Sequence, residues 1–371
     1  MINSKKIIKF ISPNIDYKDT NKIITKSLKH GLPNEGYLTK KFENRISNLI
    51  KVKHVVATTS GTIAIFLALK ALGIDKDDEV IVPNITFAAT VNAVSLTGAK
   101  PVLADVSKDN LLLDLKKLKN IISKKTKAII PVHVSGRGSN IKKLKKFASK
   151  YKIKLVEDAA EGFMSKIDRK YLGTFGDLGC FSFSPPKIIT TGQGGVVVTN
   201  NTKLYKKILE LKNQGRVGFS NGGEDKYASV GFNFKFTNIQ SALGISQLKS
   251  IFRRKQKLIK IYKLYKKHIS ENSNLKLLKF DITKGEVPLW TDIYCKKRNK
   301  LHKFLLDNGF ECRLFWHPIN YCKPYKQSFK GLENSLYLKE KLMWLPSSLS
   351  MSDKNIIKIS KLINTFSRKY L

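Results

Sequence analysis

The stretch SGTIAIFLALKALGIDKDDEVIVPNITFAATVNAVSLTGAKPVLADV, residues 60–106, alternates helical segments with short apolar runs. Residues 62–73 and 89–98 have the apolar spacing that is typical of amphipathic helices. Residues 78–83 and 100–106 are short apolar runs with the length and composition of strands. Apolar strands that alternate with helices indicate a mostly parallel sheet, covered by helices on both faces. Such a sheet binds its ligands at the carboxyl ends of its strands.

The same alternation continues towards residue 200. Further strand candidates are HVVATT (54–59), KAIIPVHV (127–134), IKLVED (153–158), GCFSFS (179–184) and GGVVVTN (194–200). We therefore expect a large α/β domain over residues 36–248, preceded by an N-terminal arm at residues 1–35. A Lys-rich helical pattern then leads into short strands and helices. Residues 249–371 are accordingly predicted to form a linking helix and a smaller C-terminal α+β domain.

The composition is strongly basic. The 371 residues include 69 Lys and Arg against 28 Asp and Glu, a formal net charge of +41. The lysines are spread along the predicted helices, arginine is scarce, and no motif of a nucleic-acid-binding domain stands out. Specific nucleic-acid binding is therefore not expected, although a non-enzymatic nucleic-acid-binding protein is one alternative. A positive field that attracts anionic small substrates is a simpler consequence of the charge.

No apolar run approaches the roughly 18 residues that a membrane span requires, and the first residues lack the pattern of a signal peptide. The four cysteines form no CxxC pair, and the histidines are too scattered to suggest a metal site. We therefore expect a cytoplasmic protein with reduced thiols, no bound metal and no membrane partner.

Ser60-Gly61-Thr62 lies where a predicted strand ends and an amphipathic helix begins. Such a turn brings free backbone N–H groups, hydroxyl groups and the positive end of a helix dipole to one point, which favours a phosphate. The alternative is an ordinary helix N-cap, because Ser and Thr are preferred at that position in any case.

Asp158 ends the apolar run IKLVED and is followed by two alanines. A carboxylate at the end of a parallel strand faces the ligand crevice, where it could hold a protonated pyridine nitrogen, a metal ion or a ribose. The two small residues let a flat ring approach the backbone. The alternative is an Asp that caps the next helix.

Lys187 lies in FSFSPPKIITTGQGG, residues 181–195, between Pro185-Pro186 and a glycine-rich turn. The prolines stiffen the approach to the lysine, and the glycines let the backbone come close to a ligand. A neutral amine in such a place can attack a carbonyl carbon. The alternative is a lysine in a surface loop, which the abundance of lysine in this chain favours.

The phosphate turn, Phe87, Asp158 and Lys187 follow one another along the chain. Pyridoxal 5′-phosphate presents four features to a protein: a phosphate, a ring face, a ring nitrogen and an aldehyde. The chain offers one matching group for each of them. A chance coincidence of all four in this order is much rarer than any one alone, so pyridoxal 5′-phosphate is the expected cofactor.

These motifs resemble those of the DegT/DnrJ/EryC1/StrS family of sugar aminotransferases. The resemblance extends from EGYLTKKFENRI to ECRLFWHPIN and is dense in residues 60–106, VEDAAEG, GTFGDLGCFSFSPPKIITTGQGGVVVTN and GFNFKFTNIQSALGISQL. It implies fold type I of the pyridoxal-phosphate-dependent transferases, which is aspartate-aminotransferase-like, with a mostly parallel central sheet and a smaller C-terminal α+β domain. It also implies a homodimer with shared active sites.

The resemblance further implies roles for particular residues. Lys187 would be the catalytic residue and would bond to the cofactor aldehyde, and Asp158 would pair with the pyridine nitrogen. Phe87 would stack on the ring, and Glu161 stands where the family has Gln or Glu near the ring hydroxyl. The cofactor phosphate would be bound by Ser60, Gly61, Thr62 and Ser182, together with Asn233, which would reach the phosphate of the neighbouring subunit.

Within the family, FSFxxxKIITTGxGG and EDAAE most resemble the enzymes that make 4-amino-4,6-dideoxy sugars, such as perosamine synthases. The implied reaction moves an amino group from glutamate to a nucleotide-linked 4-keto-6-deoxy sugar, in the synthesis of the O-antigen of lipopolysaccharide. One alternative is a nucleotide-sugar 3-aminotransferase of the same family. Another is a sugar dehydratase that uses the same cofactor, but such relatives have His in place of Lys187, which disfavours it.

The chain departs from the family in segments that are expected to face the substrate. VSGRGSNI stands where the family often has GYGxPxDM, and SPPK stands where PTK or GNK is more common. RLFWHPIN stands where RPFFYPLH is frequent, so that Asn320 replaces the usual His. These changes bear on which sugar nucleotide is bound. The candidate substrate-binding residues are Arg313, Trp316, His317 and Asn320, although Trp316 could equally be a core residue.

Overall fold

The computed structural model describes residues 7–29, 31, 33–218 and 225–371, and it confirms the expected α/β class. The strand order of the large sheet is β1-β9-β8-β5-β4-β2-β3. The pairs from β8 to β3 are parallel, whereas β9 runs antiparallel to both of its neighbours. The strands are β1 (His54–Thr58), β2 (Glu79–Pro83), β3 (Lys100–Ala104), β4 (Thr126–Ile129), β5 (Lys154–Asp158), β8 (Leu178–Ser182) and β9 (Gly195–Thr199).

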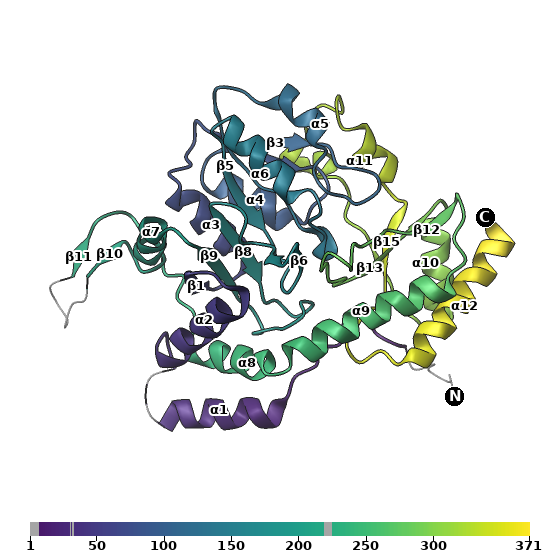
Figure 1. The fold of residues 1–371 in the computed structure, drawn as a ribbon, viewed down its shortest axis with the longest axis horizontal. Helices are drawn as coiled ribbons and strands as arrows, with labels where there is room; N and C mark the ends of the chain where they lie inside the picture. Colours follow the sequence, from purple (N-terminus) through teal and green to yellow (C-terminus); the bar gives the residue numbers. More distant parts are fainter. Residues whose placement is uncertain (1–6, 30, 32, 219–224) are drawn as a thin grey trace.

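Helices cover both faces of the large sheet, as Figure 1 shows. One face packs against α3 (Gly61–Ala71), α4 (Ala88–Leu96) and α7 (Thr202–Lys212). The other face packs against α2 (Tyr37–Ile50), α6 (Ile141–Lys150) and α8 (Asn238–Leu248). Successive side chains of a strand point to opposite faces, so Val56 and Val197 enter the core under α3, while Val55 and Val196 enter the core under α2 and α8.

The elements expected between residues 60 and 106 form close to their expected positions, as α3, β2, α4 and β3. The expected strand at residues 127–134 is shorter. β4 ends at Ile129, and beyond it the chain keeps only an isolated bridge between Val132 and Asp158. Pro131 explains the break, because proline has no N–H to donate to a sheet ladder.

A smaller antiparallel sheet lies beside the large one, on the right in Figure 1. Its strands, in spatial order, are β12 (Leu275–Leu277), β13 (Thr291–Cys295), β15 (Leu342–Leu345) and β14 (Arg313–Leu314). The helices that pack with it are α9 (Ile251–His268), α10 (Arg298–Asp307) and α12 (Asp353–Tyr370). The long helix α9 leads from α8 to this small sheet (Figure 1).

The first described residues lie against the small sheet, where Ile8 pairs with Phe310, and α1 (Tyr17–Lys29) packs against α8. The other short elements are α5 (Leu115–Leu118), β6 (Lys166–Ile167), β7 (Lys170–Tyr171), β10 (Arg216–Val217), β11 (Lys226–Tyr227) and α11 (Glu333–Leu338). Single turns of 3₁₀ helix occur at Lys119–Ile121, Ile319–Tyr321 and Lys323–Tyr325, and Val134–Gly136 form a turn in which Ser135 has a non-helical backbone.

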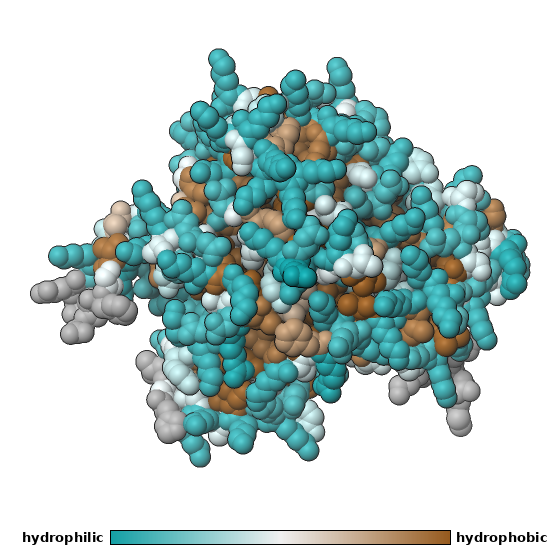
Figure 2. Space-filling model, in the orientation of Figure 1, coloured by the Kyte–Doolittle hydropathy of each residue, from teal (hydrophilic) through white to brown (hydrophobic). Residues whose placement is uncertain are grey.

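Hydrophilic side chains cover most of the molecular face drawn in Figure 2, with separate apolar patches between them. Among the residues that the structure describes, no helix combines the length and the apolar character needed to cross a bilayer.

Candidate active site

A cavity of about 240 Å³ opens at the carboxyl ends of the parallel strands, and the small sheet closes its other side. The structure brings most of the residues expected from the sequence to this one place. Those that line it are Ser60, Gly61, Thr62, Phe87, Asp158, Glu161, Ser182, Lys187, Arg313 and Trp316. The sheet topology explains the convergence, because the carboxyl ends of parallel strands meet at the same edge.

The turn after β1 forms the N-terminus of α3. Ser60 is extended and its Oγ accepts a hydrogen bond from the Ile63 N–H at 3.2 Å, so Ser60 is an N-cap as well as a cavity residue. Gly61 packs against β8, where a Cβ at this position would lie 2.8 Å from the Cβ of Ser182. The first residues of this 11-residue helix, Gly61 and Thr62, therefore line the cavity next to Ser182, at the helix end whose N–H groups lack intrahelical partners.

Asp158 ends β5 and is buried at the floor of the cavity. Its Oδ2 accepts a hydrogen bond from Thr90 Oγ1 at 2.7 Å, and its Oδ1 accepts one from the Ala160 N–H at 3.1 Å. Burial raises the pKa of the Asp158 carboxyl, although these hydrogen bonds and the charge of Lys187 act in the opposite direction. A buried carboxylate of this kind is stabilised by a cationic or N–H partner in the cavity.

Lys187 is not a surface-loop lysine, because its side chain is only 13% exposed. Its Nζ donates a hydrogen bond to Glu161 Oε1 at 3.2 Å. The same carboxylate accepts hydrogen bonds from Trp290 Nε1 at 3.2 Å and from the Ser135 N–H at 2.8 Å. The lysine is thus held by a carboxylate that is itself fixed by two further donors.

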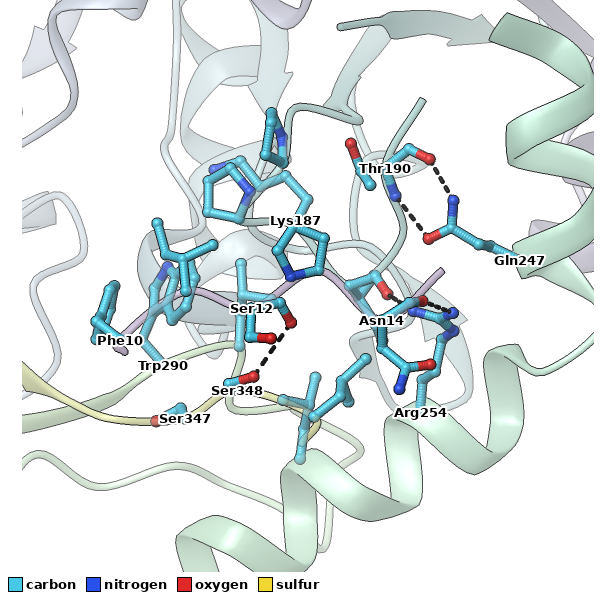
Figure 3. A pocket seen from close by; sticks show the side chains of 18 residues that line it. Phe10, Ser12, Asn14, Lys187, Thr190, Gln247, Arg254, Trp290, Ser347 and Ser348 are labelled. Atoms are coloured by element: carbon cyan, nitrogen blue, oxygen red, sulfur yellow. Dashed lines mark hydrogen bonds between the residues drawn. The ribbon is translucent and has the colours of Figure 1, made fainter. Parts of the chain in front are cut away.

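The loop that carries Lys187 is fixed from behind, as Figure 3 shows. Gln247 of α8 exchanges two hydrogen bonds with the backbone of Thr190. Arg254 of α9 donates to the carbonyl groups of Ile188 and Asn14, which joins this loop to the N-terminal segment. The loop is therefore a rigid support for the lysine.

Aromatic side chains form one wall of the cavity. Phe10 stacks on Trp290 with ring centroids 4.9 Å apart, and Trp344 also lies within the wall. Trp316 is tilted against Phe87, with ring centroids 6.1 Å apart, and Phe87 is 59% exposed. The three tryptophans of the chain all line the cavity. The sequence did not predict Phe10, Trp290 and Trp344 as cavity residues, because they come from distant segments without a shared motif.

Three of the expected residues do not line the cavity. Asn320 is buried, and it exchanges two hydrogen bonds with Asn84, at 3.1 and 3.0 Å. His317 is exposed beside Trp316. Asn233 is exposed and forms a bridge with Asn213 outside the cavity. Across the described ranges, no cluster of His, Cys, Asp and Glu has the arrangement of a metal site.

Residues 14–364 match the model of the DegT/DnrJ/EryC1/StrS aminotransferase family. A GDP-perosamine synthase of Escherichia coli O157:H7 is 34% identical over 341 residues, which cover 90% of this chain and 92% of that protein. A GDP-perosamine synthase of Vibrio cholerae is 35% identical, over 77% of this chain and 78% of that protein. A putative sugar aminotransferase of Streptococcus pneumoniae, solved in its PMP form, has the same fold, with a TM-score of 0.92 and 24% identity over 98% of this chain and 100% of that one.

The ionisation of Asp158 can be tested in the cofactor-free protein. Its raised pKa means that the folded protein holds this proton more tightly than the unfolded chain does, so stability is lost as the pH rises above the ordinary carboxyl value of about 4. Asp158→Asn cannot ionise. The melting temperature of the variant, taken relative to the wild type, is therefore expected to be higher at neutral pH than in mild acid.

The measurement is thermal unfolding of both cofactor-free proteins across that pH range. A difference in melting temperature that does not change with pH would show that the Asp158 carboxyl titrates alike in the folded and unfolded states, contrary to this expectation.

Proposed function

The chain belongs to the DegT/DnrJ/EryC1/StrS aminotransferase family, and we propose that it transfers an amino group to C4 of a nucleotide-linked 4-keto-6-deoxy sugar. It is a pyridoxal 5′-phosphate-dependent aminotransferase, as the family is. The observation that carries the proposal is the position of Lys187. Its Nζ lies in the cavity with Asp158 and Phe87 and donates to Glu161 at 3.2 Å.

The residues of the cavity fit this cofactor. The N-terminus of α3 and the Ser182 hydroxyl favour a phosphate, because their N–H and O–H groups can donate to its oxygens. A protonated ring nitrogen would offset the cost of the buried Asp158 carboxylate. The exposed face of Phe87 suits an aromatic ring. When bound, the cofactor supplies an electron sink for the negative charge that develops at the reacting carbon.

The side chains of the cavity then have separate tasks. Lys187 Nζ takes up and returns a proton at the reacting carbon, as a general base and acid. Glu161 accepts a hydrogen bond from Nζ and so fixes where that amine points. The aromatic wall of Phe10, Trp290 and Trp344 keeps water from one side of the cavity, which strengthens the electrostatic contacts inside it.

The substrate class is supported by the relatives and by charge. Two of the relatives described above are named GDP-perosamine synthases, which favours a 4-amino-4,6-dideoxy sugar as product over a 3-amino sugar. Glutamate, the proposed amino donor, and the diphosphate of a nucleotide sugar are both anionic. Arg313 of β14 is exposed and lines the cavity, and its guanidinium is the group we assign to these anions.

We also propose a cytoplasmic homodimer with shared active sites, which serves the synthesis of the O-antigen of lipopolysaccharide. Asn233 supports the dimer, because it is exposed and lies outside the cavity of its own chain, where it is free to face a second copy. The proposed division of the chain is an arm over residues 1–35, a large domain over residues 36–248, and a linking helix with a small domain over residues 249–371.

Lys187→Ala tests the proposed function directly. The wild-type protein is expected to turn yellow with pyridoxal 5′-phosphate and to form a 4-amino sugar from glutamate and a GDP- or dTDP-linked 4-keto-6-deoxy sugar. The variant is expected to lose both properties, because Lys187 is the only lysine among the described residues that line the cavity, whereas Lys53→Ala, at an exposed lysine, keeps them. A wild-type protein that stays colourless with excess cofactor would refute the proposal.

The same assay separates the alternatives. Amino transfer to a 3-keto substrate and not to the 4-keto substrate would identify a 3-aminotransferase. Loss of a sugar hydroxyl without amino transfer would identify a dehydratase.

Arg313→Ala tests the anion assignment. The KM for the nucleotide sugar or for glutamate is expected to rise about 10-fold or more, because a charge-assisted hydrogen bond is removed. Arg313→Lys is expected to recover part of that loss, since the positive charge is kept. Steady-state kinetics with each substrate in turn is the measurement. Unchanged KM values for both substrates would contradict the assignment.

A further inference from the structure

The segment VSGRGSNI departs from the family pattern, and the structure places it behind the cavity instead of in the substrate path. It contains the turn Val134–Gly136, and both Ser135 and Arg137 are buried. Neither side chain lines the cavity. The segment instead lies between Glu161 and the chain that leads into β13 of the small sheet, so its departure from the family needs an explanation other than direct contact with the sugar nucleotide.

Arg137 is enclosed by the small-sheet side of the molecule. Its guanidinium forms an ion pair with Asp292 of β13, and both side chains are almost fully buried. Its Nε donates to the Lys279 carbonyl at 2.9 Å and its Nη2 to the Leu278 carbonyl at 3.2 Å. The guanidinium also lies 3.6 Å from the centre of the Phe280 ring. A buried ion pair is tolerated only with such additional contacts, and they fix Asp292 firmly in place.

Ser135 connects the Arg137–Asp292 ion pair to Glu161 in the cavity. Its Oγ donates to Asp292 Oδ1 at 2.8 Å and accepts from Trp344 Nε1 at 3.3 Å. Its N–H donates to Glu161 Oε2 at 2.8 Å, and its carbonyl accepts from the Leu289 N–H at 3.0 Å. The hydroxyl, N–H and carbonyl groups of Ser135 are therefore all hydrogen-bonded. Its backbone has φ +54°, a left-handed conformation that is unfavourable for a non-glycine residue and that these contacts maintain.

Glu161 links Ser135 to Lys187, because its carboxylate accepts hydrogen bonds from both residues. Its Oε1 accepts from both Lys187 Nζ and Trp290 Nε1 at 3.2 Å, and its Oε2 is held by Ser135. The three donors leave the carboxylate little freedom to turn. We propose that Ser135 is a positioning residue, which transmits the fixed position of the Arg137–Asp292 pair to Glu161 and thereby orients the Lys187 amine.

This inference rests on the role of Lys187 that is proposed above. It requires that loss of the Ser135 hydroxyl affects the chemistry at Lys187. An effect only on the stability of the contact between VSGRGSNI and the chain that leads into the small sheet would not be enough. Glu286 provides a matched control, because it also contacts the segment VSGRGSNI from the chain that leads into the small sheet. It is buried, and its carboxylate accepts hydrogen bonds from the Gly138 N–H at 2.9 Å and the Asp281 N–H at 2.7 Å, neither of which belongs to Ser135 or Glu161.

The experiment compares Ser135→Ala, Ser135→Gly and Glu286→Gln in the full chain. In Ser135→Ala, kcat for amino transfer is expected to fall about 10-fold. The KM for the sugar nucleotide is expected to change by less than about 2-fold, since the substrate contacts are intact. The cofactor-free variant is also expected to turn yellow more slowly with pyridoxal 5′-phosphate than the cofactor-free wild type. Glu286→Gln is expected to lower the melting temperature but to keep the wild-type kcat and rate of colour formation.

Ser135→Gly distinguishes the effect of losing the hydroxyl group from the effect of backbone strain at this position. Glycine adopts φ +54° without strain, so this variant removes the hydroxyl while it relieves the backbone cost. It is expected to show the same kinetic loss as Ser135→Ala, and it replaces that variant in the test if Ser135→Ala does not fold. Wild-type kcat and colour formation in Ser135→Gly would overturn the inference, as would an equal kinetic loss in Glu286→Gln. A wild-type protein that never turns yellow would refute the proposed function itself.

Discussion

The hydrogen bond from Lys187 Nζ to Glu161 joins the parts of the active site. Lys187 lies in the loop after β8 and Glu161 lies just beyond β5, and the parallel pairing of these two strands brings both residues to one edge of the sheet. The carboxylate of Glu161 also accepts from Ser135 and Trp290. A buried carboxylate is costly unless its oxygens are hydrogen-bonded, so the same contacts that stabilise Glu161 determine where the lysine points. The small sheet, through Trp290, therefore takes part in orienting a residue of the large sheet.

The reversed strand β9 makes this arrangement possible. Because β9 is antiparallel to β8, the loop that carries Lys187 leaves and re-enters the sheet at the same edge. The first residue of β9, Gly195, then lies against the turn after β1, where a Cβ would come within 2.5 Å of the Ser60 carbonyl oxygen. Glycine is thus required by close packing at this point. The turn Ser60–Thr62, the carboxylate of Asp158 and Lys187 are held at one edge of the sheet.

The sequence was sufficient for the features that depend on local pattern. Strands and helices over residues 60–106 follow from apolar periodicity. Ser60, Asp158 and Lys187 were predicted because each lies at, or a few residues beyond, the end of a recognisable strand. The aromatic wall was not predicted, because Phe10, Trp290 and Trp344 meet only through tertiary packing. Asn320 occupies a motif position expected to face the substrate, but it is buried and paired with Asn84 and does not line the cavity, which no local pattern reveals. The role of VSGRGSNI depends likewise on partners more than a hundred residues away.

The central claim is that one lysine, among the many in this basic chain, is the one that bonds to the cofactor. Borohydride reduction of the protein with bound pyridoxal 5′-phosphate, followed by peptide mass spectrometry, identifies that lysine directly. The cofactor mass is expected on Lys187, in stoichiometric amount, because among the described residues it is the lysine that lines the cavity with Asp158. Stable modification of another lysine in preference to Lys187, or none at all, would contradict this assignment.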